Sequence, residues 1–213
     1  MKRKLFSGAL ILVLAVMALG ASRQSSEYRR MGIFLSNFTE AGLYNFDLEE
    51  GDMDSILHFG NNPNSAELIR FGIIHNVINN PKTTIKRCPD RHCEYGRDII
   101  SGASVAASVR KYFDLRINNH TFSGSDTFDG PDAEVYYDGR NYHINAADWR
   151  PETVYYAEVQ EVSSSRGIIT MTGELYNLRD KQDRPGTFTA TARPHVWDDK
   201  DTWAILSLYT EWR

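Results

Sequence analysis

The C-terminal stretch TWAILSLYTEW, residues 202–212, closes the part of the chain that decides the fold. It is the last of several runs between Ala133 and Trp212 in which apolar and polar side chains alternate. Alternation with a period of two is typical of antiparallel strands that bury one face. Two earlier runs assign to the buried face Ile169, Met171, Gly173 and Leu175, and then Phe188, Ala190, Ala192 and Val196.

The opposite, polar-leaning face of this sheet is the first candidate for function. Alternation within residues 202–212 puts Ala204, Leu206 and Leu208 on one face and Trp203, Ile205 and Tyr209 on the other. Arg193 and His195 share the polar parity with threonines, so we interpret this face as a recognition surface without a catalytic residue. The candidate binding residues, which include two from the link after the first hairpin, are His143, Asp148, Trp149, Arg193, His195, Trp203 and Tyr209.

A sheet with one apolar face requires a cover, and the first half of the chain supplies helical patterns for it. We predict helices from Met31 to about Glu40, from an Asn64 cap to Asn79, and from Ser101 or Ser104 to about Phe113. The predicted fold is α+β, with N-terminal helices packed on one face of a curved antiparallel sheet of about 4–6 strands. Residues 31–213 suit one domain.

The first 20 residues have the pattern of a secretory signal. Lys2, Arg3 and Lys4 precede an uncharged run from Leu5 to Ala21, which ends in small residues. We expect cleavage after Gly20, a polar leader over residues 21–30, and an exported protein in the periplasm or outside the cell. An uncleaved membrane anchor is the alternative, although 17 uncharged residues are short for a span.

The charge balance bears on partners. Removing residues 1–20 takes away three of 24 positive charges and none of 28 negative charges, so the net charge becomes −7. A chain this acidic lacks the basic footprint that nucleic acids require. We expect a protein or small-molecule partner, no nucleic acid, and membrane association only through an uncleaved N-terminal segment.

The two cysteines lie close together in Cys88-Pro89-Asp90-Arg91-His92-Cys93. In an exported protein we predict a disulfide between Cys88 and Cys93. The alternatives are free thiols, a redox pair, or a metal site formed by Cys88, His92 and Cys93. Adjacent His92 and Cys93 are poorly placed to bind the same ion, so we predict no metal site. We also predict no cofactor.

A tight turn at Asp138-Gly139 sets the register of the first hairpin. With these two residues at the centre of a type I′ turn, Glu134 lies opposite His143. This pair could form an acid–base dyad, but cross-strand charge pairs on a wet sheet face are the simpler interpretation.

Helices followed by a long antiparallel meander, over roughly residues 64–212, resemble the nuclear transport factor-like or cystatin-like α+β cone. The N-terminal segment is similar to those of exported bacterial proteins. We therefore predict an exported, non-catalytic binding protein, because the sequence lacks a nucleophile elbow, an HExxH motif and a phosphate loop. One alternative is a small-molecule enzyme or ligand carrier that uses the mouth of the cone, with Asp148, His143 or a tyrosine as acid–base groups. The other is an anchored secretion-system or envelope-assembly component.

Overall fold

The computed structural model describes residues 24–48, 65–117, 120, 135–151 and 153–213. The predicted signal at residues 1–20 and the Asn64 cap lie outside these residues. Within the described part, no helix is both long and apolar enough to cross a membrane. After a helix over residues 24–40, here called the N-terminal helix, the elements are β1 (Phe46–Asp47), α2 (Ser65–Asn79), α3 (Pro81–Thr84), β2 (Ile85–Arg87), β3 (Asp98–Ser101), α4 (Gly102–Phe113), β4 (Tyr136–Tyr137), β5 (Asn141–Ile144), β6 (Tyr155–Ser165), β7 (Ile168–Asn177), β8 (Gly186–Trp197) and β9 (Lys200–Trp212).

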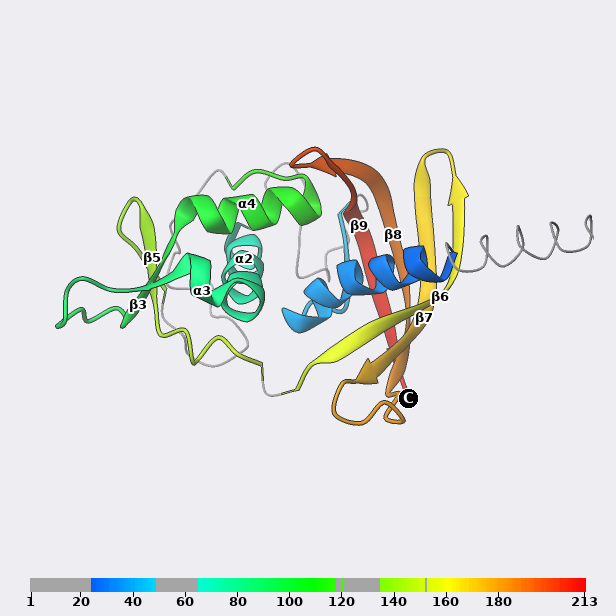
Figure 1. The fold of residues 1–213 in the computed structure, drawn as a ribbon, viewed down its shortest axis with the longest axis horizontal. Coiled ribbons are helices and arrows are strands. Elements are labelled where there is room, and N and C mark those ends of the chain that lie inside the picture. Colours follow the sequence, from blue (N-terminus) through cyan, green and yellow to red (C-terminus); the bar gives the residue numbers. More distant parts are fainter. Residues whose placement is uncertain (1–23, 49–64, 118–119, 121–134, 152) are drawn as a thin grey trace, which may run out of the picture.

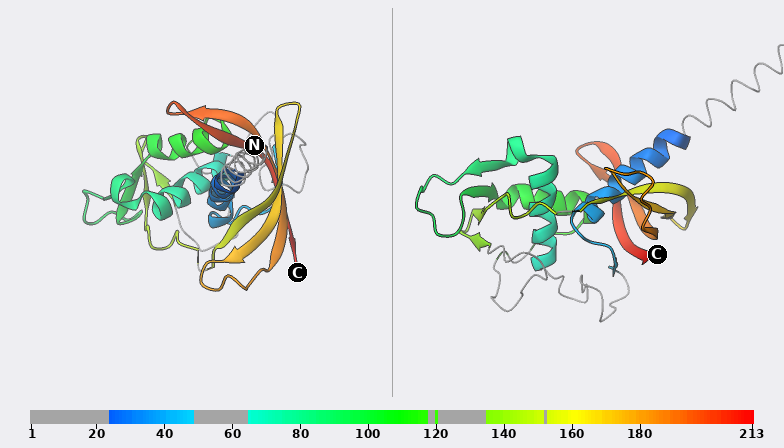
Figure 2. Two further views of the ribbon diagram at one scale, coloured as in Figure 1. Left: turned by 45° about the vertical axis from the view of Figure 1, so that its right-hand side comes forward. Right: turned by 90° about the horizontal axis from the view of Figure 1, so that it is seen from below.

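The predicted α+β class is confirmed, and the strands form two antiparallel sheets. The large sheet has five strands in the order β1-β9-β8-β7-β6, and the small sheet has four in the order β2-β3-β5-β4. The hairpin around Asp138 was predicted in the same sheet as the later strands, but it pairs with β3 in the small sheet. Figures 1 and 2 show the two sheets at opposite ends of the molecule, with α2 and α4 between them.

The N-terminal helix lies across the curved large sheet (Figure 1). Its buried apolar side chains belong to the hydrophobic core. Phe34 and Phe38 are buried and make ring contacts with Tyr112 of α4, and Phe34 also contacts Trp203 of β9. Residues 24–30, expected as a polar leader, belong to this helix. The space enclosed by the sheet is thus occupied by a helix and aromatic side chains.

The free edge of strand β6 is held by small residues of the N-terminal helix. A Cβ on Gly32 would lie 2.6 Å from the carbonyl oxygen of Ala157, so only glycine permits this approach. One turn later, the Ser36 hydroxyl accepts a hydrogen bond from the Ala157 N–H, and the Thr39 hydroxyl donates one to the Tyr155 carbonyl. Side chains of the helix thereby satisfy backbone groups that an edge strand leaves unpaired.

A β-bulge in β9 corrects the predicted faces of the last strand. Leu208 pairs with Ala190 and Ile205 pairs with Ala192, so the intervening residues differ by one between the strands. Leu208 and Ile205 both join the core although they are three residues apart. Trp203 lies two residues from Ile205 and is also buried, with 8% of its surface exposed. Its prediction as part of the polar face is wrong, because the extra residue at Leu206 shifts the side chains on its N-terminal side to the other face.

Candidate functional site

The two cysteines lie in the loop that joins β2 to β3. The Cys88 N–H donates to the Arg97 carbonyl, which continues the strand pairing by one residue. The chain then turns back. The Cys93 N–H donates a hydrogen bond to the Asp90 carbonyl, and the His92 N–H donates one to the Asp90 carboxylate. This turn returns the side chain of Cys93 to the neighbourhood of Cys88.

A histidine from a different strand completes this cluster. His143 of β5 directs its Nδ1 toward both sulfurs, 3.2 Å from Sγ of Cys93 and 3.8 Å from Sγ of Cys88. The three donor atoms all lie within 4.8 Å of one another, and the three residues are half-buried. We call this cluster, together with Asp138, the thiol–imidazole site.

Asp138 orients the imidazole from the β4–β5 turn. Its Oδ2 lies 3.0 Å from Nε2 of His143, while its Oδ1 accepts the N–H groups of Arg140 and Asn141. The N–H of Asn141 first, and then His143 and Arg140, hold the pKa of Asp138 well below its usual range against the opposing effect of desolvation. Because the Asp138 carboxylate accepts a hydrogen bond from Nε2, the proton of the neutral imidazole is on Nε2. The lone pair of Nδ1 then faces the sulfurs.

The electrostatics of the site differ between the two thiols. Desolvation raises the pKa of Cys93, but the backbone N–H of Tyr95 and the hydrogen bond with His143 outweigh it, so the net shift is downward. Desolvation and the neighbouring sulfur raise the pKa of Cys88. Desolvation lowers the pKa of His143, but Asp138 and Cys93 overcome this effect and raise it. Cys93 is thus the thiol that ionises more readily.

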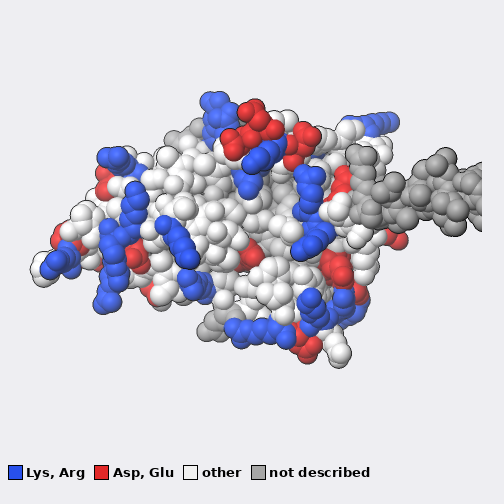
Figure 3. All heavy atoms as spheres, viewed as in Figure 1, with Lys and Arg blue, Asp and Glu red and all other residues white. Residues whose placement is uncertain are grey.

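The surroundings of the site carry more positive charge than the acidic chain as a whole suggests. Figure 3 shows lysine and arginine side chains gathered over the end of the molecule that holds the small sheet. The exposed basic residues of β2 and the following loop are Lys86, Arg87, Arg91 and Arg97, beside the exposed acids Asp90 and Glu94. A basic environment favours the thiolate form of cysteine.

The predicted turn is centred one residue too early, which places the predicted partner of His143 two residues too early in the first strand. The Asp138 N–H donates to the Asn141 carbonyl, so Gly139 and Arg140 occupy the centre of the turn, and Gly139 has φ +93°. Tyr136 therefore lies opposite His143. Glu134, the predicted partner, is outside the described residues. The first central position of this turn has positive φ, which favours Gly139 there and puts Asp138 immediately before the turn. From that position the Asp138 carboxylate reaches His143.

The structure differs from the sequence-based expectations for the two cysteines and for His92. Cys88 and Cys93 are free thiols in this structure, so the predicted disulfide is not formed in it and stays a prediction. His92 is exposed and is not part of the cluster. The third donor is His143 instead, 50 residues from Cys93, and no local spacing in the sequence indicates it.

The other predicted binding residues do not form one surface. Asp148 is exposed and Trp149 is buried at 6% exposure. Tyr209 is exposed, and its hydroxyl donates to the carboxylate of Asp47. Trp203 packs in the core. The platform predicted from strand parity is therefore divided among the core and separate parts of the surface.

Arg193 and His195 meet at the end of α4 instead. Arg193 makes an ion pair of 2.6 Å with Asp114, the αL residue that caps this helix. Nδ1 of His195 lies 3.9 Å from the same carboxylate, and only 12% of its side chain is exposed. His195 is half-buried and is not among the core residues, as its polar parity predicted, but its side chain lies against the helix end and not on an open sheet face.

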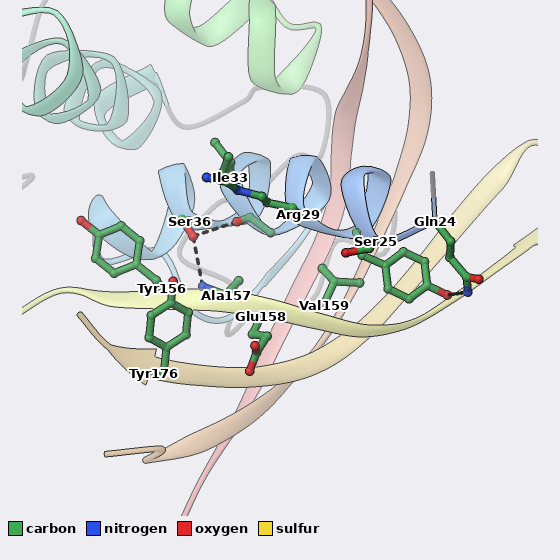
Figure 4. Close-up of a pocket in the computed structure, with 12 residues that line it drawn as sticks. Gln24, Ser25, Arg29, Ile33, Ser36, Tyr156, Ala157, Glu158, Val159 and Tyr176 are labelled. Atoms are coloured by element: carbon green, nitrogen blue, oxygen red, sulfur yellow. Dashed lines mark hydrogen bonds between the residues drawn. The ribbon is translucent and has the colours of Figure 1, made fainter. Parts of the chain in front are cut away.

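A groove of about 640 Å³ lies between the N-terminal helix and β6. Figure 4 shows its walls, which include Arg29 from the helix and Tyr156, Glu158 and Tyr176 from the sheet. The groove follows the outer edge of the sheet, far from the thiol–imidazole site. It contains no described cluster of three metal-ligating side chains.

No family model, curated protein or solved structure matches this chain. The resemblance to the nuclear transport factor-like cone therefore stays a prediction.

Proposed function

We propose that this chain is an exported binding protein that holds one soft transition-metal ion of the Zn²⁺ class through Cys88, Cys93 and His143. The observation that carries the proposal is the convergence of two sulfurs and one imidazole nitrogen within 4.8 Å. Zinc bonds of about 2.3 Å to sulfur and about 2.0 Å to nitrogen place neighbouring donors of a tetrahedral site roughly 3.5–3.8 Å apart. The two sulfur–nitrogen distances, 3.2 and 3.8 Å, bracket this range.

The chemistry of the donors supports the same ion class. Thiolates and imidazole select soft or borderline ions such as Zn²⁺ and Cu⁺ over Mg²⁺ and Ca²⁺, which prefer oxygen. Histidines that bind metals usually donate their second N–H to a carboxylate, as His143 is placed to do with Asp138. The imidazole is therefore oriented for a ligand on Nδ1 before any ion arrives.

A catalytic use of the same residues is the competing interpretation. Cys93, His143 and Asp138 have the order of a nucleophile, its base and an orienting acid. The position of Cys88 favours metal binding, because its sulfur also faces Nδ1 of His143. A nucleophile–base pair has no use for a second sulfur on the same nitrogen, whereas a metal site requires it. Export is proposed on the pattern of residues 1–20 alone, and the partner stays an unidentified protein or small molecule.

The test is a zinc titration of reduced, metal-free chain spanning residues 21–213 in competition with a chromophoric chelator. We expect one zinc ion per chain, and loss of binding in Cys88→Ser, Cys93→Ser and His143→Ala. His92→Ala is the matched control, since it changes the adjacent exposed histidine and should bind zinc normally. Thermal unfolding with and without zinc provides an independent reading, because an ion that binds only the folded chain raises Tm. Absence of zinc binding, or binding that survives all three substitutions, overturns the proposal.

A further inference from the structure

The two sulfurs of the thiol–imidazole site are close enough either to bind one metal ion together or to form a disulfide with each other. Their donor atoms lie within 4.8 Å, and only four residues separate the cysteines in a surface loop. A disulfide requires an S–S distance of about 2.05 Å, which a change of side-chain rotamer and a small loop movement can supply. Both side chains are half-buried, so small molecules in solvent can reach the site.

We propose that oxidation by a small disulfide converts Cys88 and Cys93 into a disulfide and thereby releases the metal ion, with Cys93 reacting first. This inference rests on the proposed function, because it concerns the ion bound there. It also explains why the cysteine spacing indicates a disulfide while the structure has free thiols. The disulfide belongs to the oxidised state of the site and the free thiols to the reduced state.

The exchange consists of two balanced steps. The Cys93 thiolate attacks one sulfur of the incoming disulfide, a bond forms between Cys93 and that sulfur, and the other half leaves as a thiolate. The Cys88 thiolate then attacks Sγ of Cys93 and expels the second half as a thiolate. The incoming disulfide is reduced to two thiolates, which take protons from water, and the protein dithiol is oxidised. The ion loses two of its three protein ligands and dissociates.

The order of the two cysteines follows from their positions. Cys93 lies nearer to Nδ1 of His143, at 3.2 Å against 3.8 Å for Cys88. It also lies on the turn, beyond the hydrogen bond that fixes Cys88 to Arg97 at the end of β2. In the metal-free chain used to test this order, Nδ1 of the imidazole held by Asp138 can accept the thiol proton of the nearer Cys93 and form an imidazolium–thiolate pair with it. The attacking thiol of a dithiol pair is usually the one with more thiolate character.

The test treats zinc-loaded protein with oxidised glutathione and follows zinc release with a chromophoric chelator and thiol state by intact mass. We expect release in step with loss of two hydrogens from the chain. Metal-free Cys88→Ser should accumulate a glutathione adduct on Cys93, and metal-free Cys93→Ser should form its adduct on Cys88 roughly tenfold more slowly. His92→Ala serves as the control and should release zinc at the rate of the unmodified chain.

The outcomes separate the two proposals. A chain that takes up no zinc overturns the proposed function, and the inference with it. A chain that binds zinc but retains it after both cysteines have been oxidised overturns this inference alone. So does a chain in which Cys88 forms the first adduct, which shows the opposite order of attack.

Discussion

Nε2 of His143 lies 3.0 Å from Oδ2 of Asp138, while Nδ1 of the same ring lies 3.2 Å from Sγ of Cys93. The carboxylate is itself held by two backbone N–H groups of its turn. The β-turn therefore fixes the position of Asp138, Asp138 orients the ring of His143, and this ring faces two cysteines in another loop.

Asp138→Asn should weaken zinc binding without removing a ligand. An amide in place of the carboxylate lowers the basicity of the imidazole and no longer fixes its orientation. Loss of such a partner typically costs roughly 10- to 100-fold in metal affinity. Competition with a chelator of known affinity measures the change. Asp148→Asn, an exposed carboxylate of the following turn, is the control and should leave the affinity unchanged. Equal affinities for Asp138→Asn and the unmodified chain would contradict the role of Asp138 in orienting His143.

The reactivity of Cys93 toward iodoacetamide should persist to lower pH than that of an ordinary thiol. Because the pKa of Cys93 is lowered, its thiolate fraction falls away only at a pH below the usual midpoint of about 8.5. The rate of alkylation against pH in metal-free Cys88→Ser measures this midpoint. Adding His143→Ala should move it upward, since the imidazole hydrogen bond is lost. An unchanged midpoint would show that His143 does not act on the thiol.

His75 should make the folded state less stable in mild acid. This buried ring stacks on Phe71 at a centroid distance of 5.8 Å, and burial, followed by the charge of Lys111, lowers its pKa to about 4. Between about pH 6.5 and pH 4 the unfolded chain binds a proton that the folded chain does not, so stability falls as pH falls through this window. The full effect is about 3 kcal/mol.

Urea unfolding at pH 7 and pH 4.5 tests the contribution of His75. In His75→Gln the loss of stability between these two values should be smaller than in the unmodified chain. Other groups titrate equally in both proteins, so the difference isolates the histidine. The same loss in both proteins would place the titration elsewhere.

Gly32→Ala should destabilise the fold, although alanine is the better helix former. The new methyl group would lie 2.6 Å from the backbone oxygen of Ala157, so the N-terminal helix and β6 must move apart. Overpacking of this kind costs about 1–3 kcal/mol, which exceeds the gain in helix propensity of about 1 kcal/mol. Thermal unfolding measures the change. The neighbouring substitution Ile33→Ala is the control because this side chain is 59% exposed, and a higher Tm for Gly32→Ala would refute the close packing.

The sequence permitted a correct prediction of the regular parts of the fold. Alternation predicted the buried face of β7 and of the first part of β8, where Met171, Leu175 and Ala190 keep the period of two. It failed at Val196, which was assigned to the same face but is 61% exposed near the end of β8. The cap at Ser101 was predictable from its hydroxyl, which accepts the Ser104 N–H. Parity failed at Trp203, since the bulge near Leu206 adds one residue without any local signal in composition.

The thiol–imidazole site was only partly predictable. The spacing of Cys88 and Cys93 indicated that the two sulfurs act together, but it carried no information about His143. The pairing of β5 with β3 brings that residue to the cysteine loop, and this contact depends on the fold of the small sheet. Asp138 was missed as its partner because the turn is centred one residue later than the Asp-Gly pair suggests.

X-ray absorption at the zinc edge of reduced, zinc-loaded protein is the most direct test of the central claim. We predict two sulfur ligands at about 2.3 Å and at least one nitrogen ligand at about 2.0 Å. Cys93→Ser should abolish zinc binding and leave no zinc–sulfur shell to observe. A shell of nitrogen and oxygen alone would contradict the assignment of Cys88, Cys93 and His143 as the metal site.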